Sequence, residues 1–170
     1  MDLEKIIRDV PDFPHKGILF KDITTLLKDK DALKQTIEMM AEKYRGKKVD
    51  KIVGIESRGF IFGSAVAYIL GCGFVPARKP GKLPAKTISE SYTLEYGSNT
   101  LELHEDAIQP GENVVIIDDL LATGGTAAAV AKMVETLKGN LLGIEFLIEL
   151  EFLNGKEKLK NYNVSSIIKY

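Results

Sequence analysis

Hydrophobic residues follow the chain in two alternating patterns, short uninterrupted runs and helical stripes. The runs are rich in β-branched residues, which is typical of strands buried on both faces of a parallel sheet. The stripes have helical spacing, as in Leu33, Ile37, Met40 and Tyr44, and predict amphipathic helices. Strands are expected at 51–55, 74–78, 114–117, 141–150 and 164–168, and helices at 31–44, 60–70 and 126–137. This alternation predicts an α/β domain whose mostly parallel sheet is flanked by helices.

Three parts of the chain fit this alternation poorly. The apolar positions of residues 3–7 predict a short amphipathic helix that ends before Pro11. Residues 12–27 mix aromatic, basic, proline and glycine residues and predict a loop with a brief strand. Residues 82–103 show only short polar and apolar alternations, so we expect a mobile β-rich flap or hairpin. An excursion of this length is uncommon unless it is functional, and lids that exclude water during group transfer are one such use.

One stretch, residues 114–126, joins an apolar strand, two carboxylates, a glycine turn and the start of a helix. Its sequence is VVIIDDLLATGGT. Asp118 and Asp119 follow the apolar run, so we expect them at the carboxyl end of a strand, where open α/β sheets bind ligands. The turn at 123–126 leads into a helix whose free N–H groups and dipole favour a phosphate. The complete pattern favours a phosphate site over an ordinary Asp-rich turn.

Carboxylates beside a phosphate site require a reason, because they repel phosphate. An ionised carboxylate accepts hydrogen bonds from the vicinal hydroxyls of a ribose. A bound Mg²⁺ would also reduce the repulsion. The two aspartates therefore indicate a ribose 5-phosphate that lies across the strand end.

Cations follow two other predicted strands. Arg58 comes after the strand at 51–55, and Arg78, Lys79 and Lys82 come after the next strand. A protein without net positive charge has to bind a pyrophosphate with such local cations. Alone, Arg58 would indicate a surface salt bridge, and the cluster could be a solvated turn. Because the chain also contains the stretch at 114–126, we favour a ligand-site role for Arg58. For Arg78, Lys79 and Lys82 we keep both interpretations, a pyrophosphate site and a solvated turn.

Composition narrows the functional classes. The 170 residues fit one domain spanning 1–170, and a formal net charge of −1 gives no general attraction to nucleic acid or to anionic membranes. The single cysteine, Cys72, excludes an internal disulfide and a cysteine-based metal cluster, which fits a reducing compartment. The N-terminus lacks a signal peptide pattern. Glycines and a proline interrupt the uncharged stretch 59–77, so we expect no membrane span.

Other phosphate and hydrolase motifs are missing. None of the three Gly-Lys pairs has the partner glycine that a P-loop requires. Gly71-Cys72-Gly73 looks like part of a dinucleotide fingerprint, but Pro76 stands at the third glycine position. The G-x-S-x-G motif of α/β hydrolases does not occur. Phosphoribosyl chemistry and a phosphoribosyl-binding regulator remain.

The stretch at 114–126 resembles the phosphoribosyl pyrophosphate signature of the type I phosphoribosyltransferase family. Its Leu120, Leu121 and Ala122 make it similar to the adenine phosphoribosyltransferase version. The segments DFPHKGILFKDIT, GIESRGFIFG, ARKPGKLPAKT and SYTLEYG also resemble that family, in the same order, over nearly the whole chain. The resemblance implies a single-domain type I phosphoribosyltransferase fold. It also implies a small N-terminal hood at about residues 1–30 and a flexible β flap at about residues 80–103.

The resemblance assigns expected roles to individual residues. The base would contact Leu19, Phe20 and Lys21, with Phe20 stacked on the ring. Pyrophosphate would bind Ser57 and Arg58, and the cations Arg78, Lys79 and Lys82 are further candidates. Ribose and its 5-phosphate would bind Asp118, Asp119, Ala122, Thr123, Gly124, Gly125 and Thr126. In the flap, Glu95 would be the catalytic proton-handling group and Tyr96 would close over the site. Family members often carry arginine where this chain has Lys21, and lysine at this position weakens any bidentate contact argued there.

The implied reaction is purine salvage, in which adenine and phosphoribosyl pyrophosphate give AMP and pyrophosphate. Mg²⁺ would be bound through phosphoribosyl pyrophosphate, without a direct protein ligand assigned. The resemblance further implies a cytoplasmic homodimer that binds neither nucleic acid nor membrane. Two alternatives are another purine phosphoribosyltransferase, acting on hypoxanthine, guanine or xanthine, and a non-catalytic sensor of phosphoribosyl pyrophosphate. Such a sensor would need a partner-binding or DNA-binding extension and could dispense with Glu95, which this chain carries.

Overall fold

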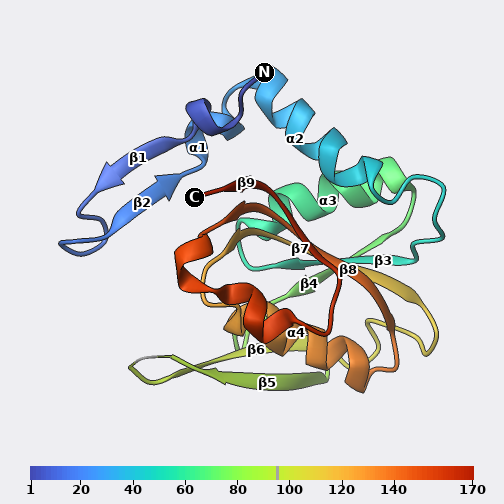
Figure 1. Ribbon diagram of the computed structural model, residues 1–170. Helices are drawn as coiled ribbons and strands as arrows, with labels where there is room; N and C mark the ends of the chain where they lie inside the picture. Colours follow the sequence, from blue (N-terminus) through green and yellow to red (C-terminus); the bar gives the residue numbers. More distant parts are fainter. Residues whose placement is uncertain (95) are drawn as a thin grey trace.

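A five-stranded parallel sheet forms the centre of the protein (Figure 1), for which a computed structural model describes residues 1–94 and 96–170. The strand order is β4-β3-β7-β8-β9, so the chain moves outward in both directions from the centre of the sheet. The strands are β3 (Lys51–Ile55), β4 (Gly73–Ala77), β7 (Asn113–Leu121), β8 (Asn140–Glu149) and β9 (Val164–Lys169). The predicted α/β class with a mainly parallel sheet is confirmed.

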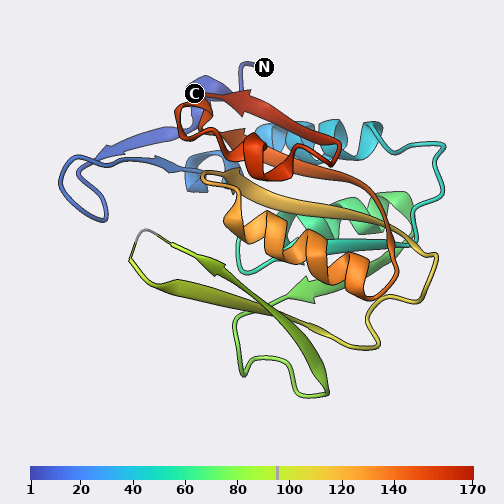
Figure 2. The same ribbon diagram turned by 60° about the horizontal axis from the view of Figure 1, so that its bottom comes forward.

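Helices cover both faces of the sheet (Figures 1 and 2). Helices α2 (Lys30–Glu42) and α3 (Gly59–Leu70) lie on one face, and α4 (Gly125–Thr136) lies on the other. Alternate residues of β7 belong to different cores: Val115 and Ile117 pack on the α2–α3 side, and Val114 and Ile116 on the α4 side. Because each strand position is buried, the run at 114–117 has no polar face.

The predicted helix boundaries have clear chemical causes. Asp29 caps α2, since its carboxylate accepts hydrogen bonds from the N–H groups of Asp31 and Ala32, both at 3.0 Å. Helix α3 ends at Gly71, which has the left-handed φ of 68° that glycine adopts without a Cβ penalty. Among the described residues, none of the helices is long and apolar enough to cross a membrane.

Two antiparallel hairpins extend beyond the same side of the sheet (Figures 1 and 2). The N-terminal hairpin consists of β1 (Arg8–Pro11) and β2 (Leu19–Asp22), and α1 (Thr24–Leu27) joins it to α2. The second hairpin, β5 (Thr87–Thr93) and β6 (Ser98–His104), packs beside α4. These hairpins occupy the segments predicted as an irregular N-terminal loop and as a β-rich flap.

The helix predicted at residues 3–7 is shorter than expected and is not an α-helix. The chain forms only one 3₁₀ turn, η1 (Glu4–Ile6), before β1 begins at Arg8. Arg8 lies opposite Asp22 in the hairpin, with 2.6 Å between Arg8 Nη2 and Asp22 Oδ2. Because a single helical turn is costly to nucleate, strand pairing and the burial of Leu3 and Ile7 determine the local structure instead.

The carboxyl-terminal end of the central strand also differs from the prediction. The apolar run predicted a strand ending at Ile117, but β7 continues to Leu121. Its pairing with β3 stops at Ile117, whereas its pairing with β8 continues to Glu149. Asp118 and Asp119 therefore lie within a strand, at the point where one neighbouring strand has ended. Beyond β8 follow the short turns η2 (Glu151–Leu153) and η3 (Gly155–Leu159).

Candidate active site

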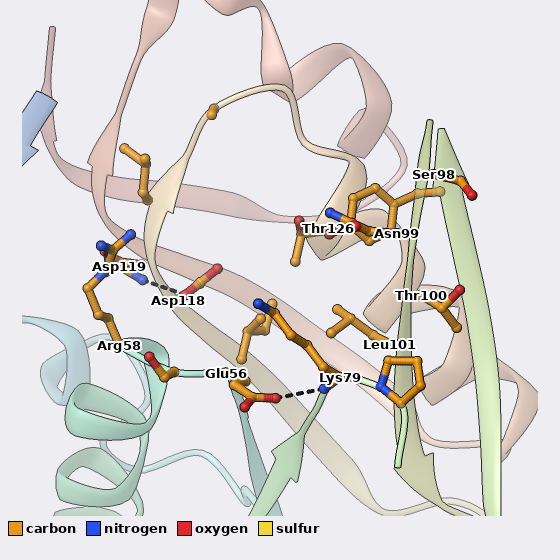
Figure 3. A pocket seen from close by; sticks show the side chains of 16 residues that line it. Glu56, Arg58, Lys79, Ser98, Asn99, Thr100, Leu101, Asp118, Asp119 and Thr126 are labelled. Carbon is orange, nitrogen blue, oxygen red and sulfur yellow. Dashed lines mark hydrogen bonds and ion pairs between the residues drawn. The ribbon is translucent and has the colours of Figure 1, made fainter. Parts of the chain in front are cut away.

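A crevice of about 790 Å³ opens at the carboxyl ends of the parallel strands (Figure 3). One wall contains the loops that follow β3 and β4, with Ser57, Arg58 and Lys79. Asp118 and Asp119 of β7 form the floor, and the opposite wall combines the start of α4 with the β5–β6 hairpin. The crevice therefore lies where open α/β sheets bind ligands.

The two aspartates of the floor differ in their partners. The Asp119 carboxylate forms an ion pair with Arg58, with 2.6 Å between Asp119 Oδ2 and Arg58 Nε. Asp118 Oδ1 accepts a hydrogen bond of 2.9 Å from the backbone N–H of Asp119. Burial raises the pKa of the Asp118 carboxyl well above its usual range, and the neighbouring Asp119 carboxylate raises it further. Without a ligand, the floor therefore disfavours two full negative charges.

Arg58 connects two predicted subsites. It immediately precedes α3, and its guanidinium carbon lies 5.7 Å from the centroid of the Phe20 ring. The same guanidinium is paired with Asp119. The structure thus brings together one residue predicted for the base, one for pyrophosphate and one for ribose, although they are widely separated in sequence.

Glu56 holds the two loops of the cationic wall together. Its carboxylate accepts a 2.7 Å hydrogen bond from the backbone N–H of Lys79 and a 3.0 Å hydrogen bond from Arg78 Nη2. Burial acts to raise the pKa of Glu56, but these bonds and the nearby cations outweigh it and lower the pKa overall. The ionised carboxylate therefore directs the Lys79 backbone, while the lysine side chain lines the crevice (Figure 3).

The turn between β7 and α4 is closely packed against η3. Gly124 has a left-handed φ of 85°, and a Cβ there would lie 2.4 Å from the carbonyl oxygen of Gly155. A Cβ on Gly155 would in turn lie 2.4 Å from the carbonyl oxygen of Ala122. Both positions therefore require glycine. The turn leaves the backbone N–H groups of the first turn of α4 at the end of the crevice, which suits an anion.

The structure gathers much of the predicted site into this crevice. The lining includes the predicted residues Ser57, Arg58, Lys79, Asp118, Asp119, Ala122 and Thr126, and the turn residues Thr123, Gly124 and Gly125 lie between the last two. In the described part of the chain, Arg78 and Lys82 lie outside the lining: Arg78 is paired with Glu56, and Lys82 is exposed.

The base and flap residues lie farther out. Leu19, Phe20 and Lys21 belong to β2 of the N-terminal hairpin, with Lys21 Nζ 2.6 Å from Asp9 Oδ1 and 3.7 Å from the centroid of the Tyr170 ring. Tyr96 is 88% exposed. Glu95, the predicted catalytic group, lies outside the described residues.

Several crevice residues were missed by the sequence analysis. Tyr92 and the β6 residues Ser98, Asn99 and Thr100 line the wall that faces Lys79. The alternation in β5 was an available signal for Tyr92: the apolar Ile88 marks the face of this strand that packs on the core, and every second residue shares it. No sequence pattern near Gly155 indicates that this residue contacts the turn between β7 and α4.

The crevice lining that the structure describes offers oxygen ligands, among them the carboxylates of Asp118 and Asp119. No group of three or more His, Cys, Asp or Glu side chains suitable for a metal ion occurs among those residues. Mg²⁺ commonly binds through one or two carboxylates together with substrate phosphates, so Asp118 and Asp119 fit such a shared site but not a cage made of protein alone.

Comparison with known proteins agrees with this geometry. The model of the phosphoribosyl transferase domain family matches residues 22–168. The adenine phosphoribosyltransferase of Brachyspira hyodysenteriae is 59% identical over 170 residues, which cover 100% of both chains. The crystal structure of the Thermoanaerobacter pseudethanolicus enzyme of that name is 56% identical, with a TM-score of 0.96 and coverage of 99% of this chain and 98% of the other.

A second solved structure is an adenine phosphoribosyltransferase of Saccharomyces cerevisiae, complexed with an imino-altritol bisphosphate and adenine. It is 43% identical with a TM-score of 0.92, and the match covers 97% of this chain and 96% of the yeast chain. The fold, the crevice and this full-length likeness lead to one assignment: the chain belongs to the phosphoribosyltransferase family and is similar over its full length to adenine phosphoribosyltransferases.

Proposed function

We propose that this protein transfers the 5-phosphoribosyl group of phosphoribosyl pyrophosphate to adenine, producing AMP and pyrophosphate in purine salvage. The observation that carries the proposal is the convergence in one crevice of two buried carboxylates, a helix N-terminus and the cations Arg58 and Lys79. A ribose with a phosphate at one end and a pyrophosphate at the other matches this order of groups. Relatives named adenine phosphoribosyltransferase support adenine as the acceptor.

The sugar is proposed to lie over β7. Asp118 and Asp119 would accept hydrogen bonds from the ribose hydroxyls, and the turn from Ala122 to Thr126 would donate its N–H and hydroxyl groups to the 5-phosphate. The raised pKa of Asp118 supports a role in ligand binding, because two hydroxyl donors would stabilise a carboxylate that burial and the Asp119 carboxylate disfavour.

Pyrophosphate and base are proposed to lie on either side of Arg58. Ser57, Arg58 and Lys79 would meet the pyrophosphate, while Arg78 acts through Glu56 to hold the loop. Lys82 would contact the pyrophosphate only if the loop that follows β4 moves. Phe20 would stack on the base, with backbone groups of Leu19 facing its edge and Lys21 securing the hairpin through Asp9.

The reaction breaks the bond between ribose C1 and a pyrophosphate oxygen and forms a bond between C1 and N9 of adenine, which loses its proton. Glu95 is proposed to handle that proton, with Tyr96 closing over the base; such acid–base help is typically worth about 10²–10⁴-fold. Charge develops on the sugar ring as C1 becomes oxocarbenium-like. The Asp118–Asp119 floor can stabilise that positive charge, and Arg58 and Lys79 can stabilise the departing pyrophosphate.

Mg²⁺ fits the same site as a partner of the substrate. The oxygens of Asp118 and Asp119 would hold it together with oxygens of phosphoribosyl pyrophosphate. When bound, the ion neutralises part of the pyrophosphate charge. We place the protein in the cytoplasm, a compartment in which the lone thiol of Cys72 stays reduced.

The protein is also proposed to form a homodimer. Ile61 and Tyr68 of α3 are large apolar side chains with exposures of 41% and 88%, and Leu33 and Ile37 of α2 line an apolar groove beside Tyr68. A second copy would cover this surface. Light scattering should give twice the chain mass, and Tyr68→Glu should give the monomer mass; a monomeric native chain would contradict the dimer.

The activity test supplies phosphoribosyl pyrophosphate and Mg²⁺ with adenine, hypoxanthine, guanine or xanthine in separate reactions. We expect AMP from adenine and about a hundredfold less nucleotide from the other bases, because a buried polar group that the wrong base leaves unpaired costs about 1–3 kcal/mol. A larger yield of another nucleotide would reassign the base. Binding of phosphoribosyl pyrophosphate without any nucleotide product would favour the sensor alternative.

A further inference from the structure

Tyr92 makes a polar contact that the proposed chemistry does not use. It lies on β5, and its hydroxyl oxygen is 3.0 Å from Thr126 Oγ1, in the first turn of α4. Thr126 lines the crevice (Figure 3) and belongs to the turn proposed for the 5-phosphate. The flap strand thus contacts the phosphate turn through a pair of hydroxyl groups.

The ring of Tyr92 makes a second contact with the same turn. A Cβ on Gly125 would lie 2.9 Å from Tyr92 Cδ2, so the ring rests directly on the Gly125 backbone. The ring also packs against the core cluster on the α4 side of the sheet. Packing against the core accounts for an aromatic ring at this position, but it does not require a hydroxyl group at the crevice wall.

The remaining polar link between β5 and α4 is weaker. Lys132 Nζ lies 3.4 Å from Glu90 Oε2, and the lysine side chain is 67% exposed. Exposed ion pairs contribute little to stability and are screened by salt. Of these two polar links, the contact of Tyr92 with Thr126 is therefore the one better able to hold β5 at the phosphate turn.

The hydroxyl pair has a chemical consequence for phosphate binding. Thr126 has one hydroxyl proton, and Tyr92 is positioned to accept a hydrogen bond from it. When a phosphate accepts the hydrogen bond from Thr126 instead, the Tyr92 hydroxyl can rotate and donate to Thr126 Oγ1, because hydroxyl hydrogens turn to suit their partners. The chain of hydrogen bonds then runs from Tyr92 through Thr126 to the phosphate, and successive bonds polarise one another.

We propose that Tyr92 is a positioning residue for the phosphoribosyl substrate, which holds Thr126 and the Gly125 backbone in place for the 5-phosphate. Since Tyr92 belongs to the β5–β6 hairpin, it also connects 5-phosphate binding with the hairpin that carries the flap tip. The inference rests on the proposed 5-phosphate site and adds a residue that acts on it from another element.

The test is Tyr92→Phe, which retains the ring over Gly125 and removes only the hydroxyl. With Phe at position 92, Thr126 loses the donor that holds and polarises it while it binds the 5-phosphate, so KM for phosphoribosyl pyrophosphate should rise about 2- to 12-fold, the fold-change of one typical hydrogen bond. KM for adenine and kcat should stay within about twofold, because the ring and the rest of the crevice are unchanged. A purely structural role of Tyr92 would instead lower the melting temperature without this selective change in KM.

Tyr162→Phe is the matched control. Tyr162 donates a 2.9 Å hydrogen bond to Glu135 Oε1, so this variant also removes a tyrosine hydroxyl bonded to α4, but at the far end of the helix. Its KM values should equal those of the native protein. An equal rise in KM for both variants would show a general effect on α4 and overturn the proposal.

A double-mutant cycle separates this inference from the assignment of the phosphate turn. Thr126→Val removes the partner hydroxyl with little change in shape, and Tyr92→Phe should add almost nothing to its effect. If Thr126→Val leaves KM for phosphoribosyl pyrophosphate unchanged, the proposed 5-phosphate site is wrong. If Thr126→Val raises KM but Tyr92→Phe does not, or if the two effects are fully additive, only the role of Tyr92 is wrong.

Discussion

Gly155→Ala tests whether η3 sets the position of the phosphate turn. The new Cβ would lie 2.4 Å from the Ala122 carbonyl oxygen and 2.9 Å from Leu121 Cδ1. Since a closely packed interior has no room to absorb the overlap, the turn has to move by about 0.6 Å or more. A misplacement of about 1 Å can cost 100-fold in rate, so we expect about a 10-fold fall in kcat/KM for phosphoribosyl pyrophosphate.

The same overlap should be visible in stability. Overpacking of this kind costs about 1–3 kcal/mol, which lowers the melting temperature of a chain of this size by about 2–12 °C. Initial rates of AMP formation at varied phosphoribosyl pyrophosphate, together with thermal unfolding followed by circular dichroism, measure both effects. A separate titration of adenine should show little change, because the shift occurs at the phosphate end.

Two other glycines provide the controls. Gly71 has a φ of 68° and open space around its Cβ position, so Gly71→Ala should cost stability of about 1 kcal/mol and leave KM unchanged. Gly124 combines a φ of 85° with the 2.4 Å approach to Gly155. Gly124→Ala should therefore lower stability more than either Gly71→Ala or Gly155→Ala does. A Gly155→Ala variant with a lowered melting temperature but native kcat/KM for phosphoribosyl pyrophosphate would show that η3 does not set the position of the phosphate turn.

Three further predictions concern carboxylates. Asp118→Asn should slow transfer but raise the melting temperature at neutral pH. Burial and the adjacent carboxylate raise the pKa of Asp118, so the native protein loses stability as the pH rises and this carboxyl ionises. Melting curves should show that this gain disappears below about pH 4, where the carboxyl is protonated in both states, and a loss of stability at neutral pH would contradict it. The hydrogen bond from Arg8 lowers the pKa of Asp22 to about 2, so its stabilising contribution is present above about pH 4 and is lost as pH falls toward 2. NMR titration should show a higher Asp22 pKa in Arg8→Ala, and an unchanged value would disprove the coupling. Glu145→Ala removes the acceptor of the buried Tyr44 hydroxyl, 2.9 Å away, and should lower stability by about 1–3 kcal/mol in urea unfolding without changing KM; native stability would count against this network.

The sheet and the convergence of its loops could be predicted from the sequence. A β-branched run without a polar face, such as residues 114–117, has few stable positions other than the middle of a covered parallel sheet. Once the strands are parallel, the residues that follow them must meet at one edge. The ion pair between Arg58 and Asp119 is an instance of that geometry.

Contacts that depend on tertiary packing could not be predicted in this way. The end of β7 is set by the length of β8 beside it, so the burial of Asp118 is invisible in the local pattern. Gly155 looks like a turn residue, and nothing near it indicates the carbonyl of Ala122. Residues 3–7 have a helical stripe, but the strand pairing of Arg8 with Asp22 overrides it. Local periodicity predicts elements better than it predicts which elements touch.

The placement of β7 between β3 and β8 has a consequence for local unfolding. Backbone amides of this strand should exchange with deuterium only when the whole domain opens, whereas the N-terminal hairpin is a separate two-stranded sheet that can open alone. The carboxylates proposed to bind the sugar would thus lie in the part of the molecule that opens least often. The residues proposed to bind the base would lie in a part that opens more often. At mild denaturant concentrations, selectivity among purines should decline before the capacity to bind the sugar phosphate does.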